Sequence, residues 1–432
     1  MNITAAIKKL LTLSFPIIIG QISLMLIGVG DVYIASLYST KSVAAIGVAF
    51  STGNPTMLFG IGLTMGIAPI LAKRRGLGKT GQNYLLSFLN YSFFLGLIFI
   101  LITYGVIYLI PQFGLTEGII PSVMKYLEVT VWSLPFVFGF SALKEYLSGY
   151  EEVFWPNFIA FLGIFLNLLL NYILVFGAFG SVGIGEIGLA WSSLSIRLIM
   201  FIALIFIVWK KEGWGIHDKA LLKETWKLSL PVGFIFFLEV LAFCLVGILA
   251  GKLTIIEAAS SQLTITLASI VFMVPLSLSS AVAVKVGHAF GSKNSEELKL
   301  YIWAVISVTA VYALCTMSLF FSIPRLLLGI LTNDEQVIEI GVHLLLIAGI
   351  FQLVDSAQAV LSGVLRGLNR TLIPSITTFL GYWMIGIPIG LYLTFYREIG
   401  VQGLWVGLAV ALAFVAFFQG IYLIYSIRKI SS

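Results

Sequence analysis

Charged residues are scarce in this 432-residue chain: Asp, Glu, Lys and Arg make up 10% of the sequence, whereas 59% of its residues are hydrophobic. A soluble globular domain has about 25% charged residues, so this composition excludes a large water-soluble domain. Cysteine is rarer still, since the chain contains only Cys244 and Cys315, each inside an apolar run. We therefore expect two small buried hydrophobic residues and no disulfide or metal pair.

Motifs for catalysis and nucleotide binding are also missing. The three histidines are scattered along the chain, and neither an HExxH nor a GxSxG stretch occurs. The GxGxxG pattern at 183–188 leads into an apolar run and follows no strand, which disfavours dinucleotide binding. The net charge of +6 is divided among small clusters between apolar runs, so nucleic acid is not an expected partner. The sequence predicts a protein that is not an enzyme and has no metal or organic cofactor.

Long apolar runs are the main feature that is present. A membrane helix needs about 20 apolar residues, so each run is long enough to cross a bilayer. The expected fold class is an all-α membrane protein with twelve transmembrane helices. The runs lie near 13–35, 45–72, 82–110, 122–147, 157–177, 188–209, 228–251, 258–284, 300–323, 340–363, 373–396 and 401–427.

The basic residues between the runs predict the orientation. With twelve spans, every second loop lies on the same side of the membrane as the two chain ends, and these loops hold most of the Lys and Arg residues. The loops on the opposite side hold only Lys41, Lys252, Arg325 and Arg397. Because cytoplasmic loops are enriched in Lys and Arg, both termini are expected to be cytoplasmic. The predicted location is the inner (plasma) membrane of the cell, with many passes.

The two halves of the chain share short motifs at an offset of 215 residues. LSFP at 13–16 recurs as LSLP at 228–231, and GEIGL at 185–189 recurs as GVQGL at 400–404. Such a duplication predicts two six-helix lobes that are parallel repeats around a central cleft, as in alternating-access transporters. The expected segments are an N-terminal lobe at 1–209, a cytoplasmic linker at 210–227 and a C-terminal lobe at 228–432.

Two carboxyl groups lie deep inside predicted spans of the second half. Glu239 is 12 residues beyond Lys227, and Asp355 is 11 residues before Arg366, which places both about 17 to 18 Å from the cytoplasmic side. Ionisable residues at this depth are costly and usually face protein or water. Burial opposes the charged form, which suits reversible proton binding, and the same oxygens also suit a hard monovalent cation. The alternative is a packing role with a hydrogen bond to a neighbouring helix.

Polar residues of the first half form a second candidate set. Asp31 is a well-embedded carboxyl of the first span, and Asn167 and Asn171 share one helix face because they are four residues apart. The amides suit either ion or substrate binding or hydrogen bonding between helices. Arg197 in the sixth span needs a partner or water, and we expect a structural salt bridge more than a substrate contact.

Several stretches resemble the multidrug and toxic compound extrusion (MATE) family of secondary antiporters, over essentially the whole chain. PIIIGQ at 16–21, running on to Asp31, is similar to the pattern of the family's first span. LSGVLRGLNRT at 361–371 is similar to its leucine-arginine-glycine stretch after the tenth span, and Gln262 lies where the family often has glutamine. FLEV at 237–240 resembles the seventh-span acidic motif of the NorM-type branch.

The resemblance implies roles for these residues. The implied cation-coupling residues are Glu239, Asp355 and Asp31, and the implied polar cluster for substrate or ion is Asn167, Asn171 and Gln262. Some sodium-coupled members carry a tyrosine four residues before the tenth-span aspartate, where this chain has Phe351, which offers no oxygen ligand. Coupling to H⁺ and coupling to Na⁺ therefore both remain open.

The function implied by the resemblance is an antiporter, driven by H⁺ or Na⁺, that exports organic cations and drugs by alternating access of two lobes. The alternative is a lipid-linked oligosaccharide flippase of the same superfamily, which would need a basic cavity to hold pyrophosphate. Arg197 alone supplies little of that charge. The expected partners are the lipid bilayer and small organic cations, and the protein is expected to be a monomer.

Overall fold

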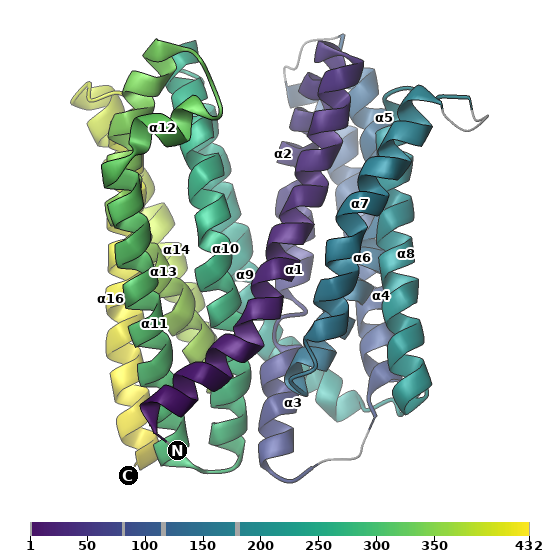
Figure 1. Ribbon diagram of the computed structural model, residues 1–432, viewed down its shortest axis with the longest axis vertical. Helices are drawn as coiled ribbons and strands as arrows, with labels where there is room; N and C mark the ends of the chain where they lie inside the picture. Colours follow the sequence, from purple (N-terminus) through teal and green to yellow (C-terminus); the bar gives the residue numbers. More distant parts are fainter. Residues whose placement is uncertain (1, 80–82, 114–117, 178–181, 432) are drawn as a thin grey trace. The chain divides into compact units, whose positions relative to one another are not determined.

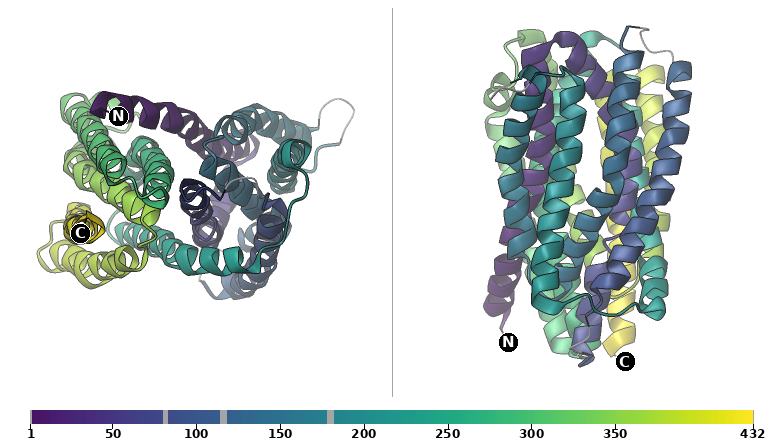
Figure 2. Two further views of the ribbon diagram at one scale, coloured as in Figure 1. Left: turned by 90° about the horizontal axis from the view of Figure 1, so that it is seen from below. Right: turned by 90° about the vertical axis from the view of Figure 1, so that its right-hand side faces the viewer.

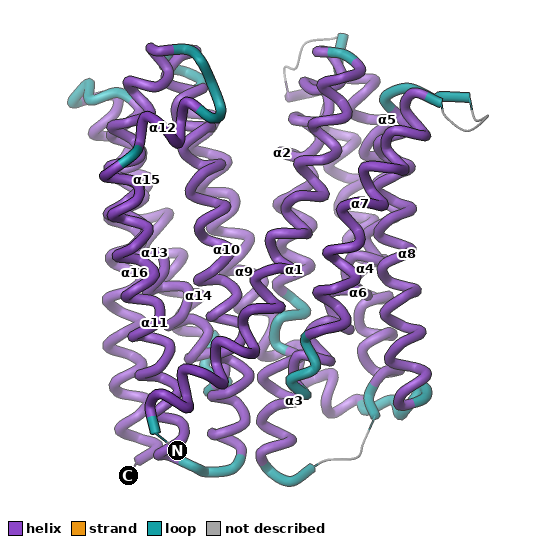
Figure 3. The backbone as a smooth tube through the Cα atoms, in the orientation of Figure 1, coloured by secondary structure: helices purple, strands orange, loops and turns teal. Residues whose placement is uncertain are grey.

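The structure, a computed structural model, describes residues 2–79, 83–113, 118–177 and 182–431. Over these ranges the regular elements are helices and none is a strand (Figures 1 and 3). The first half contains α1 (Ile3–Tyr38), α2 (Thr40–Gly62), α3 (Ile67–Gly76), α4 (Leu85–Leu109), η1 (Ile110–Phe113), α5 (Ile120–Thr130), η2 (Val131–Ser133), α6 (Leu134–Gly149), α7 (Phe154–Phe176) and α8 (Ile187–Glu212). The second half contains α9 (Lys219–Ala250), α10 (Ile255–Gly291), α11 (Ser295–Ser322), α12 (Pro324–Gly329), α13 (Glu335–Gly367), α14 (Leu372–Phe379), η3 (Leu380–Gly386), α15 (Ile387–Leu391), η4 (Tyr392–Tyr396) and α16 (Val401–Ser431).

Twelve helical stretches in the described ranges are long and apolar enough to cross a membrane, which confirms the predicted number of spans. Some spans comprise several elements, because α2 and α3 form one span together and η2 joins α5 to α6. The eleventh span is the most irregular. It contains two π-helical stretches, η3 and η4, on either side of α15. Such π-helical insertions in α-helices often occur at functional sites.

Polar caps define where several long helices begin. Asp334 accepts hydrogen bonds from the backbone N–H groups of Gln336 and Val337 at the start of α13. Asn294 caps α11 and Thr254 caps α10 in the same way. Each side-chain oxygen accepts a hydrogen bond from the backbone N–H three residues later. These caps satisfy N–H groups that have no partner within the helix.

The chain divides into two compact units. The N-terminal unit comprises Pro16–Leu71 and Lys79–Gly233, and the C-terminal unit comprises Met1–Phe15, Ala72–Gly78 and Phe234–Ser432. Within each unit the helices lie side by side along much of their length (Figure 2). The assignment of 1–209, 210–227 and 228–432 to lobe, linker and lobe stays a prediction.

The core of the N-terminal unit depends on close contact between small and aromatic residues. Phe138 is fully buried, and its ring packs edge-on against Phe99 at a centroid distance of 5.3 Å. A Cβ at Gly60 would lie 2.2 Å from the Phe138 ring, so only glycine leaves room for this side chain. Helices in lipid associate through such close van der Waals packing, because lipid is as apolar as the helix surface itself.

The core of the C-terminal unit surrounds Trp405 of α16. The Trp405 ring is fully buried, packs against Phe351, and donates through Nε1 to Ser261 Oγ at 3.1 Å. On the same helix, Gly407 allows α16 to approach the end of η3 closely, since a Cβ there would lie 2.5 Å from the Gly386 carbonyl oxygen. Small residues thus again set the helix spacing.

Hydrogen bonds at equivalent helix ends confirm the internal repeat. Ser42 Oγ, near the start of α2, donates to Glu186 Oε2, just before α8, at 2.8 Å. Shifting 42 and 186 by 215 residues gives 257 and 401, and Val401 N donates to Glu257 Oε1 at 3.0 Å. Both units therefore join the same pair of helix ends through one carboxylate. In the N-terminal unit the carboxylate belongs to Glu186, just before α8, whereas in the C-terminal unit it belongs to Glu257, near the start of α10.

The predicted linker at 210–227 is ordered along the start of α4. Ile216 N donates to the Asn83 carbonyl at 2.9 Å, and Ser87 Oγ donates to the Ile216 carbonyl at 2.9 Å. Asn83 also donates through Nδ2 to the carbonyls of Glu212 and Gly213, where α8 ends. Helix α8 ends at Glu212 and α9 begins at Lys219, so most of the segment is helical.

Candidate functional site

A buried carboxylate cluster surrounds Asp31 in the N-terminal unit. Its Oδ1 accepts from Asn167 Nδ2 at 2.9 Å and from Asn171 Nδ2 at 2.7 Å, both on α7. Its Oδ2 accepts from Ser193 Oγ of α8 at 2.7 Å. These four side chains are at most 2% exposed. The structure therefore brings three residues predicted from the sequence into one site and adds Ser193.

The donors around Asp31 differ in what they can do. Each asparagine turns its NH₂ group toward Oδ1, so it can only donate, which favours the ionised carboxylate. Ser193 can turn its hydroxyl and accept instead, so Oδ2 is the oxygen that can carry a proton without losing its partner. Asn171 Oδ1 is buried and has no hydrogen-bond partner among the described residues. The cluster thus keeps one free acceptor oxygen for a cation or a water molecule.

Ser193 gave no signal by itself in the sequence, because serine is common in membrane helices. It lies one turn before Arg197, however, and residues four apart on a helix share a face. A search of the helix face of the charged residue would have found it. The two side chains connect α8 to different neighbours, Ser193 to Asp31 and Arg197 to Ser133.

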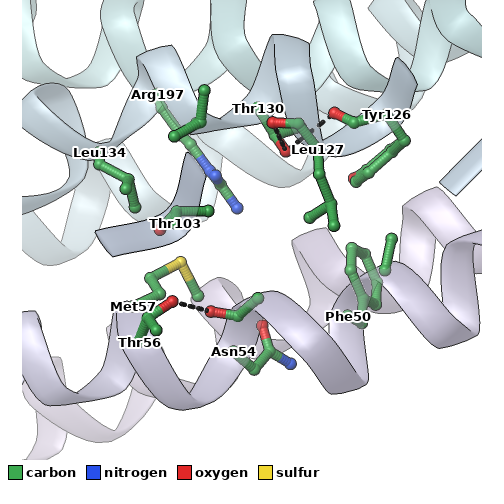
Figure 4. A pocket seen from close by; sticks show the side chains of 13 residues that line it. Phe50, Asn54, Thr56, Met57, Thr103, Tyr126, Leu127, Thr130, Leu134 and Arg197 are labelled. Atoms are coloured by element: carbon green, nitrogen blue, oxygen red, sulfur yellow. Dashed lines mark hydrogen bonds between the residues drawn. The ribbon is translucent and has the colours of Figure 1, made fainter. Parts of the chain in front are cut away.

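Arg197 has no salt bridge, contrary to the expectation from the sequence. In the described part of the chain no carboxylate oxygen lies within 4.0 Å of it, and its Nη1 donates to Ser133 Oγ at 2.6 Å. Ser133 in turn donates to the Thr130 carbonyl at 2.5 Å. The oxygens of Asp31 accept hydrogen bonds from three neutral donors, so the interaction of Asp31 with Arg197 is a long-range electrostatic one. The guanidinium instead lines a pocket within the N-terminal unit (Figure 4).

A second carboxylate site lies in the C-terminal unit. Glu239 of α9 accepts through Oε1 from Gln358 Nε2 of α13 at 2.9 Å. Asp355, one turn before Gln358, is 8% exposed, and its carboxylate is close enough to that of Glu239 for the two to repel each other. The structure therefore brings the two predicted acidic residues together and adds Gln358 as a neutral donor that orients Glu239.

Aromatic side chains pack beside this carboxylate pair. Phe243, one turn after Glu239, has ring contacts with Phe351 at 6.2 Å and with Tyr382 of η3 at 6.4 Å between centroids. Tyr382 is fully buried and lies within electrostatic reach of both carboxylates. Phe351 has no oxygen, whereas Tyr382 carries a phenol that interacts electrostatically with this pair. The π-helical stretch that carries it could not be inferred from the sequence.

Gln262 of α10 lies apart from these contacts. Its side chain is exposed, and in the described chain it makes no hydrogen bond with Glu239 or Asp355. The described residues also contain no group of three or more His, Cys, Asp or Glu side chains arranged to hold a metal ion. The two carboxylate clusters, one around Asp31 and one at Glu239 and Asp355, are therefore the candidate functional sites.

The fold and these sites define the class: a multi-pass, all-helical membrane protein of twelve spans, duplicated in sequence, with carboxylates inside both units. The MatE family model matches residues 16–173 and 231–392, and the chain belongs to this family. Two similar proteins are named multidrug resistance protein MdtK. The one from Photorhabdus laumondii is 30% identical over 94% of this chain and 92% of its own length, and the one from Proteus mirabilis is 30% identical over 96% and 94%.

Solved structures share the fold. The eukaryotic MATE transporter AtDTX14 superposes with a TM-score of 0.90 at 18% identity, covering 99% of this chain and 98% of its own. An outward-facing multidrug resistance MATE family transporter of the MOP superfamily superposes with a TM-score of 0.89 at 17% identity, covering 99% and 97%. At this level of identity the likeness establishes the fold.

Proposed function

We propose that the protein is a secondary active antiporter that exports amphipathic organic cations in exchange for H⁺ or Na⁺. The observation that carries this proposal is the pair of carboxylates at Glu239 and Asp355, embedded in spans and close enough to repel each other. Membership of the MatE family and the name of the MdtK relatives support export of drugs.

The coupling chemistry follows from the charge of the pair. Two carboxylates that repel each other in a medium of low dielectric constant cannot both stay ionised without a cation. Each state of the site therefore holds a proton or a metal cation, or exposes the charge to water. Gln358 holds Glu239 by a neutral hydrogen bond and leaves Asp355 to exchange the cation. Release of the coupling cation then changes the charge of the C-terminal unit by one.

The Asp31 cluster is the corresponding candidate in the N-terminal unit. Three neutral donors stabilise its carboxylate, and Asn171 Oδ1 adds an unused acceptor. We expect it to bind H⁺ or Na⁺ in the same cycle, with the two lobes opening alternately to each side of the membrane. The proposed setting is the inner membrane, with both termini cytoplasmic and the protein a monomer.

The test uses purified protein in lipid vesicles with ethidium, a fluorescent organic cation. Vesicles are loaded either at pH 6 or with sodium, and are then diluted into sodium-free buffer at pH 8. Wild-type protein should take up ethidium as H⁺ or Na⁺ leaves the vesicles. Glu239→Gln and Asp355→Asn should abolish this uptake, because a neutral amide cannot exchange a cation. Glu335→Gln is the matched control, since Glu335 is an exposed carboxylate at the start of α13. Wild-type uptake rates in both site variants would disprove the assignment.

A further inference from the structure

The turn that follows α13 repeats the turn that follows α6. LSGYEE at 147–152 recurs as LRGLNR at 365–370. In each stretch the sixth residue donates its backbone N–H to the carbonyl of the first, at 2.9 Å and 2.8 Å, and the fifth residue has a positive φ, of 67° and 59°. Arg370 therefore occupies in the C-terminal unit the position that Glu152 occupies in the N-terminal unit.

These two corresponding positions carry opposite charges. In the N-terminal unit Glu152 forms a salt bridge with Lys211 of α8. Shifting 211 by the repeat offset of 215 residues gives 426, and Arg370 Nη1 donates to Ser426 Oγ of α16 at 2.8 Å. The C-terminal unit thus keeps the contact between the turn and its last helix. It replaces a neutralised ion pair with a guanidinium bound to a neutral hydroxyl.

The positive charge at this end of the C-terminal unit has no acidic partner. In the described part of the chain no carboxylate oxygen lies within 4.0 Å of the Arg370 guanidinium. The only acidic residue after Asp355 is Glu398, which lies beyond the opposite end of the eleventh span. Arg428, near the end of α16, is exposed and also forms no salt bridge with a described residue. Two arginines are therefore available to an external anion.

The guanidinium of Arg370 is held in place. Its partner Ser426 is fully buried, and its Cζ lies over the Tyr422 ring, 5.9 Å from the ring centroid. The one described side-chain hydrogen bond of Arg370 uses one of five N–H donors, so donors remain for a ligand. A planar guanidinium that is already oriented binds a phosphate with less loss of side-chain entropy than a lysine would.

The surface beside this charge is apolar. Helix α14 packs against α16, and both belong to membrane spans. Leu372 and Ile376 of α14 and Ile421 and Tyr425 of α16 are exposed. A small phosphate in water would contact the arginines alone, whereas the acyl chains of a phospholipid would also cover these side chains. The surface therefore favours a lipid over a free anion.

We propose that Arg370 and Arg428 bind the phosphate group of an anionic phospholipid, whose acyl chains lie along the exposed faces of α14 and α16. Charge-assisted hydrogen bonds between guanidinium and phosphate supply the selectivity for this headgroup. Basic residues between membrane helices on the cytoplasmic side bind anionic headgroups, and this end is expected to be cytoplasmic. The corresponding position of the N-terminal unit is neutralised by its own ion pair, so the expected site belongs to one unit. This binding goes beyond the proposed antiport and does not depend on it.

Two phospholipids with identical acyl chains isolate the charge of the headgroup. Palmitoyl-oleoyl phosphatidylglycerol is anionic, and palmitoyl-oleoyl phosphatidylcholine has no net charge. Native mass spectrometry of the delipidated full-length protein in detergent gives the Kd for the first molecule of each lipid. Wild type should bind phosphatidylglycerol about tenfold more tightly than phosphatidylcholine. Adding inorganic phosphate at about 1 mM should leave this ratio unchanged, because free phosphate lacks the contacts of the acyl chains.

Four variants make the result specific. Arg370→Gln should weaken binding of phosphatidylglycerol about tenfold and change that of phosphatidylcholine by less than about twofold. Arg370→Glu combined with Ser426→Lys copies the ion pair of the N-terminal unit, so it should lose the preference while keeping the turn joined to α16. Arg428→Gln should cause a smaller loss, because this arginine is not held by a buried partner. Arg325→Gln also lowers the net charge by one, but Arg325 is paired with Glu335, so the ratio should stay that of wild type.

Three results would overturn the proposal. Wild type could show no preference for phosphatidylglycerol, or both Arg370 variants could keep the wild-type ratio. Loss of the preference on addition of inorganic phosphate would show that the site binds free phosphate and not lipid. An equal loss in Arg325→Gln and Arg370→Gln would show that net charge alone decides. No ion gradient enters this measurement, so its failure leaves the antiporter proposal standing, and failure of ethidium uptake leaves the lipid site standing.

Discussion

Replacing Ser193 by alanine should lower the free energy of unfolding by an amount that depends on the charge of Asp31. Ser193 Oγ donates to Asp31 Oδ2 at 2.7 Å in a fully buried setting. A hydrogen bond to a charged group contributes about 1.5 to 3 kcal/mol, so Ser193→Ala should lower the free energy of unfolding by that amount while Asp31 is ionised. Ser192→Ala is the matched control, because its hydroxyl makes only a 3.5 Å contact with the Asn167 carbonyl. We expect less than about 0.5 kcal/mol there.

The assay is equilibrium unfolding in mixed detergent micelles at pH 8, followed by circular dichroism, for wild type, Ser193→Ala, Asp31→Asn and the double variant. In the Asp31→Asn background the serine has no carboxylate to donate to, so its removal costs less there and the two effects should not add. The expected interaction free energy is about 1 to 2 kcal/mol. Effects that add to within about 0.5 kcal/mol would refute a direct bond between these side chains. A loss in Ser192→Ala as large as in Ser193→Ala would show that any small cavity in α8 has the same effect.

Three other outcomes follow from the structure. Gly60→Val should destabilise the N-terminal unit by about 1 to 3 kcal/mol in a thermal unfolding experiment, because the added atoms meet the Phe138 ring. Phe138→Leu in the same chain should restore part of this loss of stability. Glu186→Gln should raise hydrogen exchange in the first turns of α2 and α8, because the carboxylate accepts from hydroxyls on both α2 and α5. Equal exchange in variant and wild type would contradict this. Lowering the pH or adding sodium should weaken equilibrium binding of ethidium to wild type, because antiport requires ion and drug to favour opposite states. Asp355→Asn should lose this dependence. An ethidium affinity that stays constant from pH 5.5 to 8 and on addition of sodium would contradict antiport.

The twelve spans, the duplication and the residues whose burial is costly could all be predicted from the sequence. Lipid cannot satisfy a polar backbone or a charge, so span length and embedded charge leave a strong pattern in the sequence. Asp31, Glu239 and Asp355 were found for this reason. Asn167 and Asn171 were found because a spacing of four residues places them on one helix face.

Which neutral side chains complete each site can be seen only in the tertiary structure. Ser193 is 162 residues from Asp31 in the sequence, and Gln358 is 119 residues from Glu239. Such pairs form only when two helices have the right rotation and depth, and these are set by many close contacts such as that of Gly60 with Phe138. Arg197 shows the same limit, since its charge predicted that it needs a partner but did not identify that partner. Arg197 donates to a hydroxyl in η2 in place of the expected carboxylate, while the Asp31 carboxylate accepts hydrogen bonds from three neutral donors.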